Sequence, residues 1–214
     1  MTDDDSTGGA TADDYADVFG GDDDFLESHC VTYVEGLTPD ALLRELGAEP
    51  VRTGQPVVGI RQLRELTTRT WTPERDPNLV GAAGLGGWTV MVEYNGLAGT
   101  EPGLVASLSR GRTVVSHAAN VAAPEPFHWA RDGEIRTTLG EGPFDRGGTR
   151  PDALLEIMRQ VGYGPLRAPD EEEYASFALA AFALAARLTG VRLHREWLRT
   201  TPFTCGIVPL PAPA

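Results

Sequence analysis

The segment from Gly86 to Gly96 constrains the fold of this chain more than any other part of the sequence. Its side chains alternate between one set, Trp88, Val90, Val92 and Tyr94, and a second set, Thr89, Met91, Glu93 and Asn95. A period of two residues is typical of a β-strand, whose successive side chains point to opposite faces of a sheet. The glycines and Asn-Gly at its two ends tolerate positive φ and therefore mark its limits. We predict a central strand of an antiparallel sheet.

Helices and short strands follow one another along the rest of the chain. Thr38 and Pro39 form a helix start, with a hydroxyl group as N-cap and proline at the first helical position. The run from Phe177 to Ala186 is apolar on all sides, which indicates a helix that is buried on most of its surface. Successive strands need no long crossover connection, which favours antiparallel pairing. We therefore predict an α+β fold: a single domain with a mainly antiparallel sheet and helices packed on one face.

The clearest hairpin signal lies between Phe127 and Leu139. Asp132-Gly133 fits a two-residue type I′ turn, in which both residues adopt positive φ. The predicted pairs are Arg131 with Glu134, Ala130 with Ile135, and Trp129 with Arg136. The first pair joins opposite charges and the third joins a cation to an aromatic ring, so cross-strand chemistry supports the turn.

Acidic residues are concentrated near the N-terminus. The chain of 214 residues has a net charge of −13, and residues 1–28 hold ten of its 31 acidic residues and no arginine. Residues 1–24 offer too little apolar surface to offset the entropy of ordering. We predict a disordered acidic tail over 1–24, one domain over 25–208 and a Pro/Ala tail over 209–214. Tyr15 and Phe19 leave two interpretations open: a solubilising tail, or a segment that docks on a partner or mimics nucleic acid.

The basic residues and the cysteines narrow the range of partners and compartments. All 18 basic residues are arginines, and the nearest approach to a basic patch is the group Arg187, Arg192, Arg195 and Arg199. We assign this group to helix ends and a solvated face, and so predict no nucleic-acid partner.

No apolar run is long enough to span a bilayer and no signal peptide is visible, so we expect no membrane partner. Cys30 and Cys205 form no disulfide framework, so we expect free thiols and a cytoplasmic location.

Few residues form a pattern that catalysis or metal binding requires. His117 and His128 lie on strands that could be neighbours, and Glu93 points from another strand. One hypothesis is therefore a pocket between sheet and helices that these three side chains line. Their spacing is not that of metal ligands, and the adjacent His29 and Cys30 point to opposite faces of a strand, which is wrong for a Cys–His dyad. We predict no catalytic residue, no metal and no cofactor.

The hairpin provides a candidate surface for a protein partner. Phe127, Trp129, Arg131 and Arg136 share one face of the predicted hairpin. Aromatic residues and arginines are enriched at protein interfaces. In a second interpretation, Phe127 and Trp129 pack against the helices and the arginines cover them. The sequence leaves both interpretations open.

Six segments of the chain together resemble one protein family. They are residues 32–47, 86–93, 108–120, 127–133, 151–155 and 187–191. In combination they look like the DUF6461-like group, an actinobacterial family of functionally uncharacterised proteins, over about residues 28–200. The resemblance implies a cytoplasmic protein of a high-GC Gram-positive bacterium. It implies no activity, substrate or site residue.

These observations favour a non-enzymatic cytoplasmic protein-interaction module that neutralises or regulates a protein partner. The acidic tail and the aromatic–arginine hairpin face motivate this expectation, because complementary charges guide protein association. One alternative is a small-ligand-binding or enzymatic domain with the pocket described above. Another is a structural subunit of a larger assembly. The sequence leaves the oligomeric state open.

Overall fold

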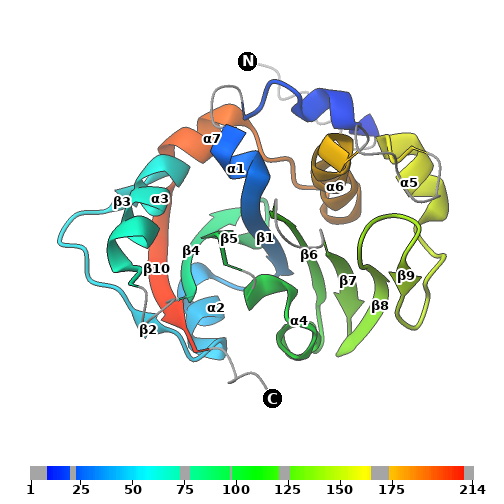
Figure 1. Cartoon of the computed structure of the whole chain (residues 1–214). Coiled ribbons are helices and arrows are strands. Elements are labelled where there is room, and N and C mark those ends of the chain that lie inside the picture. The colour runs from blue at the N-terminus through cyan, green and yellow to red at the C-terminus, as the bar shows by residue number, and fades with distance from the viewer. Residues whose placement is uncertain are drawn as a thin grey trace.

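A ten-stranded antiparallel sheet forms the centre of the protein, with the strand order β2-β10-β4-β5-β1-β6-β7-β8-β9 and with β3 paired to β10 (Figure 1). The computed structural model describes residues 9–19, 23–72, 78–96, 98–120, 126–164 and 174–209. The strands are β1 (Ser28–Glu35), β2 (Glu49–Pro50), β3 (Val57–Val58), β4 (Asn78–Leu85), β5 (Trp88–Tyr94), β6 (Thr113–Asn120), β7 (Phe127–Arg131), β8 (Glu134–Leu139), β9 (Arg146–Gly147) and β10 (Pro202–Val208). The α-helices are α1 (Asp23–Glu27), α2 (Pro39–Glu45), α3 (Gly59–Thr70), α4 (Pro102–Leu108), α5 (Leu155–Val161), α6 (Tyr174–Thr189) and α7 (Arg195–Thr200), and the 3₁₀ helices are η2 (Ala12–Tyr15) and η3 (Ala98–Thr100). The predicted α+β class and antiparallel sheet are confirmed.

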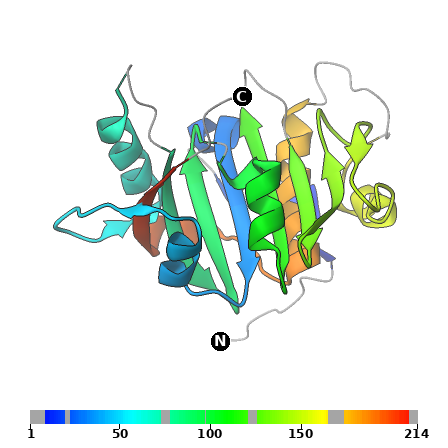
Figure 2. The same ribbon diagram turned by 90° about the horizontal axis from the view of Figure 1, so that it is seen from below.

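The central strands β1, β5 and β6 are buried on both faces of the sheet. On one face, Val90 and Val92 belong to a core that includes residues of α3, α6 and α7. On the other face, Met91 belongs to a second core with residues of α2 and α4. Figure 2 shows α2 and α4 in front of the sheet and α6 behind it. Helices therefore cover both faces of the sheet, whereas the sequence predicted helices on one face. The prediction was wrong because Thr89 and Glu93 on the second face are polar and yet buried.

The hairpin of β7 and β8 has the predicted turn but a different register beyond it. Asp132 and Gly133 have φ values of 56° and 87°, as a type I′ turn requires. Two predicted pairs are confirmed, but Trp129 lies opposite Thr137 instead of Arg136, because a β-bulge separates Trp129 from Ala130. The backbone carbonyl of the bulged Arg136 accepts a hydrogen bond from the N–H of Arg150 at 2.6 Å. The bulge therefore depends on a segment that is distant in sequence from the turn.

Residues 9–19, which we name the N-terminal segment, pack against the longest helix, α6. The ring centroids of Tyr15 and Phe19 lie 5.7 Å and 4.7 Å from that of Phe182. Both rings are buried, and Asp14 forms an ion pair with Arg192 at 3.1 Å. The N-terminal segment is therefore packed, whereas the sequence predicted that it is disordered. It is packed because α6 is apolar on all sides, and the segment covers the outer side of this helix. Of the two predicted tails, residues 1–8, 20–22 and 210–214 lie outside the described residues, and residues 23 and 24 begin α1.

Within the described ranges, none of the helices combines the length and the apolar character that crossing a lipid bilayer requires. The helix α6 has 16 residues, and its apolar surface is covered from within the protein by α5, β6 and the N-terminal segment.

Replacing Phe19 with alanine tests whether the N-terminal segment is part of the folded domain. We expect Phe19→Ala to lower the free energy of unfolding by about 3 kcal/mol, because it deletes a buried ring that contacts Phe182. The exposed Asp13→Ala variant in the same segment is the control, with an expected change within about 0.5 kcal/mol. Urea denaturation measures both. Equal stability of the two variants would contradict the packing described for this segment.

Candidate functional site

The three residues of the predicted pocket lie on two different faces of the sheet. Glu93 pairs with Cys30 of β1, whereas His117 pairs with the next residue, Val31. Because successive residues of a strand point to opposite faces, Glu93 and His117 are separated by the sheet. His128 lies on the same face as Glu93, and all three side chains are at most 5% exposed. A pocket that all three residues line is therefore not formed.

Glu93 and His128 instead belong to a buried polar cluster on the face that α2 and α4 cover. Its members are Cys30, Thr32, Glu93, Ser116 and His128, on the neighbouring strands β5, β1, β6 and β7. The Glu93 carboxylate accepts hydrogen bonds from the backbone N–H groups of Ala98 and Gly99 at 3.0 Å and 2.8 Å. The hydroxyl groups of Thr32 and Ser116 are hydrogen-bonded at 2.9 Å. The cluster thus holds the 3₁₀ helix η3 against the sheet.

Burial keeps the thiol and the imidazole of this cluster neutral. Burial, together with the nearby Glu93, raises the pKa of Cys30 well above its usual range, so the reactive thiolate is not formed. Burial lowers the pKa of His128, whose Nε2 lies 2.9 Å from the carbonyl oxygen of Thr100 and therefore carries the proton. Its Nδ1 atom has no hydrogen-bond partner among the described residues.

Glu93 is the group of this cluster whose protonation is sensitive near neutral pH. Burial raises the pKa of Glu93 to about 7, and the N–H groups of Gly99 and Ala98 act in the opposite direction. Its carboxyl group can therefore exchange a proton at neutral pH while remaining 1% exposed. In this arrangement the carboxyl group positions a backbone turn.

His117 forms a second buried site on the opposite face, together with His29. The Nε2 atom of His29 lies 3.4 Å from Nδ1 of His117, and Nδ1 of His29 lies 2.9 Å from the carbonyl oxygen of Phe25. Burial lowers the pKa of His29 to about 4 and lowers the pKa of His117 further below its usual range. Phe182 packs edge-on against His117, with ring centroids 4.4 Å apart. In the part of the chain that the structure describes, no group of three or more His, Cys, Asp or Glu residues could hold a metal ion.

The hairpin residues of the predicted partner face are divided between the core and the surface. Phe127 is 1% exposed and stacks beside His117, and Trp129 is half-buried against the same core. Arg131 is exposed, and Arg136 contacts Asp132 at 3.7 Å. The two aromatic side chains thus pack inward, as in the second interpretation, and of the two arginines Arg131 is exposed whereas the Arg136 side chain is 20% exposed.

Two clefts meet at Arg112, near the ends of α2 and α4. One has a volume of about 420 Å³ between these helices, and the other has about 360 Å³ beside Arg131 and Asp132. Arg112 donates two hydrogen bonds to the Glu45 carboxylate, at 2.6 Å and 3.1 Å. The Glu45 carboxylate neutralises Arg112, the arginine that both clefts share. The clefts therefore show no clear preference for a ligand of either charge.

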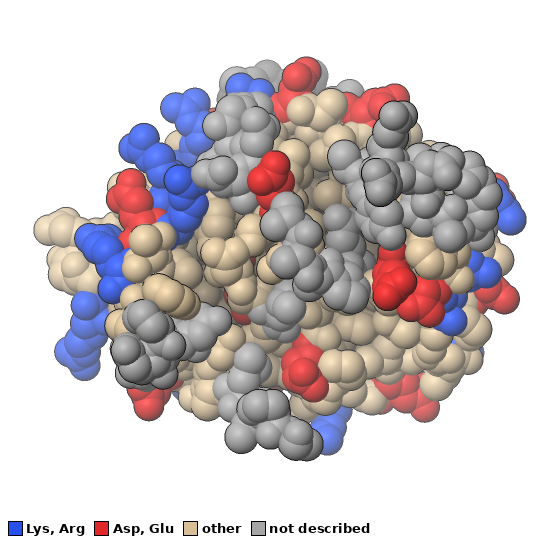
Figure 3. Space-filling view, in the orientation of Figure 1, with Lys and Arg blue, Asp and Glu red and all other residues tan. Residues whose placement is uncertain are grey.

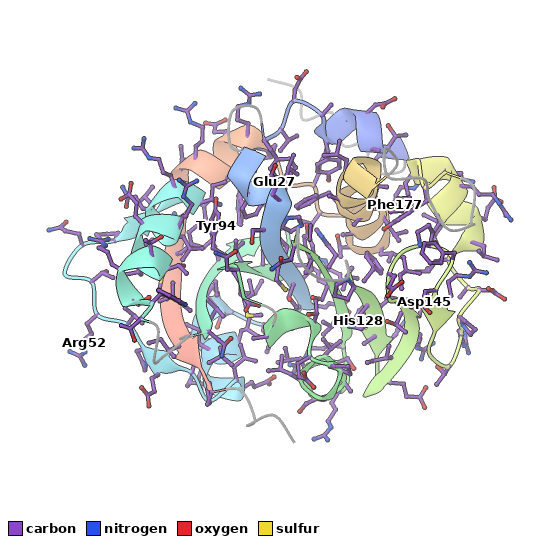
Figure 4. All side chains as sticks on the ribbon, in the orientation of Figure 1. Glu27, Arg52, Tyr94, His128, Asp145 and Phe177 are labelled. Carbon is purple, nitrogen blue, oxygen red and sulfur yellow. The ribbon has the colours of Figure 1, made fainter. Side chains whose placement is uncertain are left out.

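A surface that the sequence analysis recognised only at Arg195 and Arg199 lies along α3, α7 and the loop between β2 and β3. We name it the arginine band, and its members are Arg52, Arg61, Arg64, Arg69, Arg195 and Arg199. Figure 3 shows these basic side chains gathered along one side of the molecule, and Figure 4 shows Arg52 extending outward from its loop. Trp71, which directly follows α3, is 52% exposed and is the exposed large apolar side chain of the described residues. The arginines at 61 and 64, three residues apart, were the available signal, because this spacing places them on one side of a helix.

The fold defines an α+β protein whose antiparallel sheet is covered by helices on both faces. The sequence profile of a family of unknown function, DUF6461, matches residues 8–212. The chain therefore belongs to this family. No curated protein matches the chain in a sequence comparison, and no solved structure matches it either.

Replacing Gly99 with alanine tests the close packing of η3 on the buried polar cluster. A Cβ atom at this position would overlap with Thr32 Oγ1 and would lie 2.9 Å from Cys30 Sγ. We expect Gly99→Ala to lower the free energy of unfolding by about 2 kcal/mol. Gly103→Ala in α4 is the matched control, because its Cβ atom would enter open space and alanine favours the helix by about 0.5 kcal/mol. Opposite signs for the two variants are expected in chemical denaturation, and equal effects would contradict the packing.

Replacing Glu93 with glutamine tests the raised pKa of this carboxyl group. The folded state binds the Glu93 proton more tightly than the unfolded state, so Glu93 makes stability fall as pH rises from 4.5 to about 7. Relative to Glu93→Gln, we expect the wild type to lose on the order of 3 kcal/mol across this window. The buried histidines change stability in the opposite direction in both proteins and cancel in the difference. The exposed Glu101→Gln variant controls for loss of a charge, and a difference curve without slope would contradict the raised pKa.

Proposed function

We propose that this protein is a non-enzymatic protein-interaction module that regulates a protein partner. The observation that carries the proposal is the exposed Trp71 beside the arginine band. Tryptophan and arginine are enriched among the residues that dominate binding energy at protein interfaces. The backbone N–H of Trp71 donates to the carbonyl oxygen of Thr67 at 3.0 Å, so the end of α3 holds the backbone of this exposed indole. A side chain held in this way loses less conformational entropy when a partner covers it, which suits it to anchor an interface.

The position of the reactive side chains also favours binding over catalysis. Cys30, Ser116 and Glu93 are at most 1% exposed beneath η3. A catalytic group must come within hydrogen-bonding distance of its substrate, and side chains with at most 1% exposure present almost no surface to one. The polar cluster therefore supports a structural role in this conformation.

The proposed location is the cytoplasm of an actinobacterium. Cys30 and Cys205 are both buried free thiols, which suits a reducing compartment. The arginine-only set of basic residues accords with the high-GC coding that such an origin implies.

Capture of a partner from a native lysate tests the proposed function. We expect the full chain to retain a protein at a stoichiometric ratio, as measured by quantitative mass spectrometry. Trp71→Ala should lower recovery at least tenfold, because truncation of an interface tryptophan typically costs more than about 1.4 kcal/mol.

The control is Arg150→Ala, which changes an exposed arginine outside the arginine band. It should leave both recovery and the melting temperature unchanged. Deleting residues 1–8 separates the acidic terminus from the N-terminal segment, which packs on α6. If the wild-type chain retains no stoichiometric protein, with or without residues 1–8, the proposed function is wrong.

A further inference from the structure

We infer that the partner presents an acidic protein surface that docks on the arginine band, with an apolar side chain placed against Trp71. This inference rests on the proposed function and specifies the chemistry of the partner. The inferred partner charge is opposite to the one that the net charge of the chain alone would suggest. A chain of net charge −13 would ordinarily be expected to attract a basic partner.

The charge of the arginine band is opposite to that of the whole chain. Residues 51–56, α3 and α7 together contain six arginines and two acidic residues, Glu65 and Glu196. At physiological ionic strength, exposed charges act over roughly 8 Å, so a docking surface experiences the charge of the band more strongly than acidic residues elsewhere on the chain. Asp17, whose backbone carbonyl accepts a hydrogen bond from Arg195, adds one acidic residue at the α7 end of the band. An acidic surface is therefore attracted to this side of the molecule.

The side chains of Arg61, Arg69, Arg195 and Arg199 retain guanidinium donors for a partner. The guanidinium groups of Arg61 and Arg199 form no hydrogen bond or ion pair with any other described residue. Arg69 and Arg195 donate to the backbone carbonyls of Glu65 and Asp17, so neither is neutralised by a carboxylate among the described residues. By contrast, Arg112 is bidentate to Glu45. Free guanidinium groups of this kind bind carboxylates in paired hydrogen bonds.

The two helices that carry the band form one rigid platform. The N–H of Gly59, the first residue of α3, donates to the carbonyl oxygen of Thr201 at 2.9 Å. Gly59 has a φ of +73°, and a Cβ atom there would collide with the carbonyl group of Arg199, so the end of α7 directly adjoins the start of α3. Buried Leu63 and Leu198 fix the two helices to the core. The backbone positions of the five arginines on α3 and α7 are thus set before a partner binds.

A protein partner fits this surface better than a nucleic acid. A duplex carries one negative charge per ≈ 1.7 Å of its axis, and a basic stripe without interruption suits it best. Here Glu65 lies between Arg61 and Arg69 on α3, and Glu196 follows Arg195 on α7. An acidic protein surface can place its carboxylates at the arginines alone and can cover Trp71 with an apolar side chain.

The test uses the full chain and a labelled synthetic peptide with the repeat Glu-Glu-Leu, measured by fluorescence anisotropy at low salt. We expect saturable binding that weakens at least tenfold between 20 mM and 200 mM salt, because screening reduces attraction between exposed charges. The double variant Arg61→Glu/Arg199→Glu should weaken binding at least tenfold. The matched control Arg44→Glu/Arg150→Glu changes the net charge equally at exposed sites outside the band and should change binding less than twofold.

The milder variant Arg61→Gln/Arg199→Gln keeps the test interpretable if charge reversal impairs folding. Absence of saturable peptide binding, or equal loss in the band and control variants, would overturn the inference. Tighter binding of a DNA duplex than of the peptide would also overturn it, in favour of nucleic acid. If the lysate partner is retained equally by wild type and band variant, this inference fails while the proposed function stands; if wild type retains no partner, the proposed function itself fails.

Discussion

Burial of the central strands on both faces is the constraint on which the rest of the structure depends. Because β1, β5 and β6 have no solvated face, every polar side chain on them requires a partner inside the protein. Glu93 meets this requirement through the backbone of η3, and His29 meets it through the carbonyl oxygen of Phe25. The buried polar cluster and the histidine pair are thus explained by the packing of the sheet. The proposed contact with a partner is assigned to the outer surfaces of the helices.

Local chemistry could be predicted from the sequence, and long-range packing could not. Thr38 caps α2 through the N–H of Ala41, and Asp132-Gly133 forms the expected turn, because each feature depends on residues within four positions. The bulge, in which Arg136 is the extra residue opposite Trp129 and Ala130, is hydrogen-bonded to the backbone N–H of Arg150, which no local pattern indicates. The prediction that the second face of the sheet is not covered by helices was wrong, since the polar residues Thr89 and Glu93 resemble solvated residues. Acidic composition likewise concealed the contact of Tyr15 and Phe19 with Phe182.

The candidate site could be predicted only in part, because it too depends on long-range packing. Alternation along the strands correctly placed Glu93 and Met91 on one face, but the register between strands decides whether His117 joins them. That register was not available from the sequence. The arginine band lies on α3 and α7, which are separated by more than 100 residues of sequence and meet through the backbone at Gly59. Its positive charge is therefore a property of the fold.

Hydrogen–deuterium exchange of the full chain, with and without its captured partner, tests the central claim most directly. The claim is that the partner covers α3, α7 and Trp71 while the sheet and its buried polar cluster remain closed. It predicts slower exchange in peptides from α3 and α7 in the complex and unchanged exchange in β1, β5 and η3. Protection confined to the hairpin of β7 and β8 or to the clefts at Arg112, or faster exchange at η3, would contradict it.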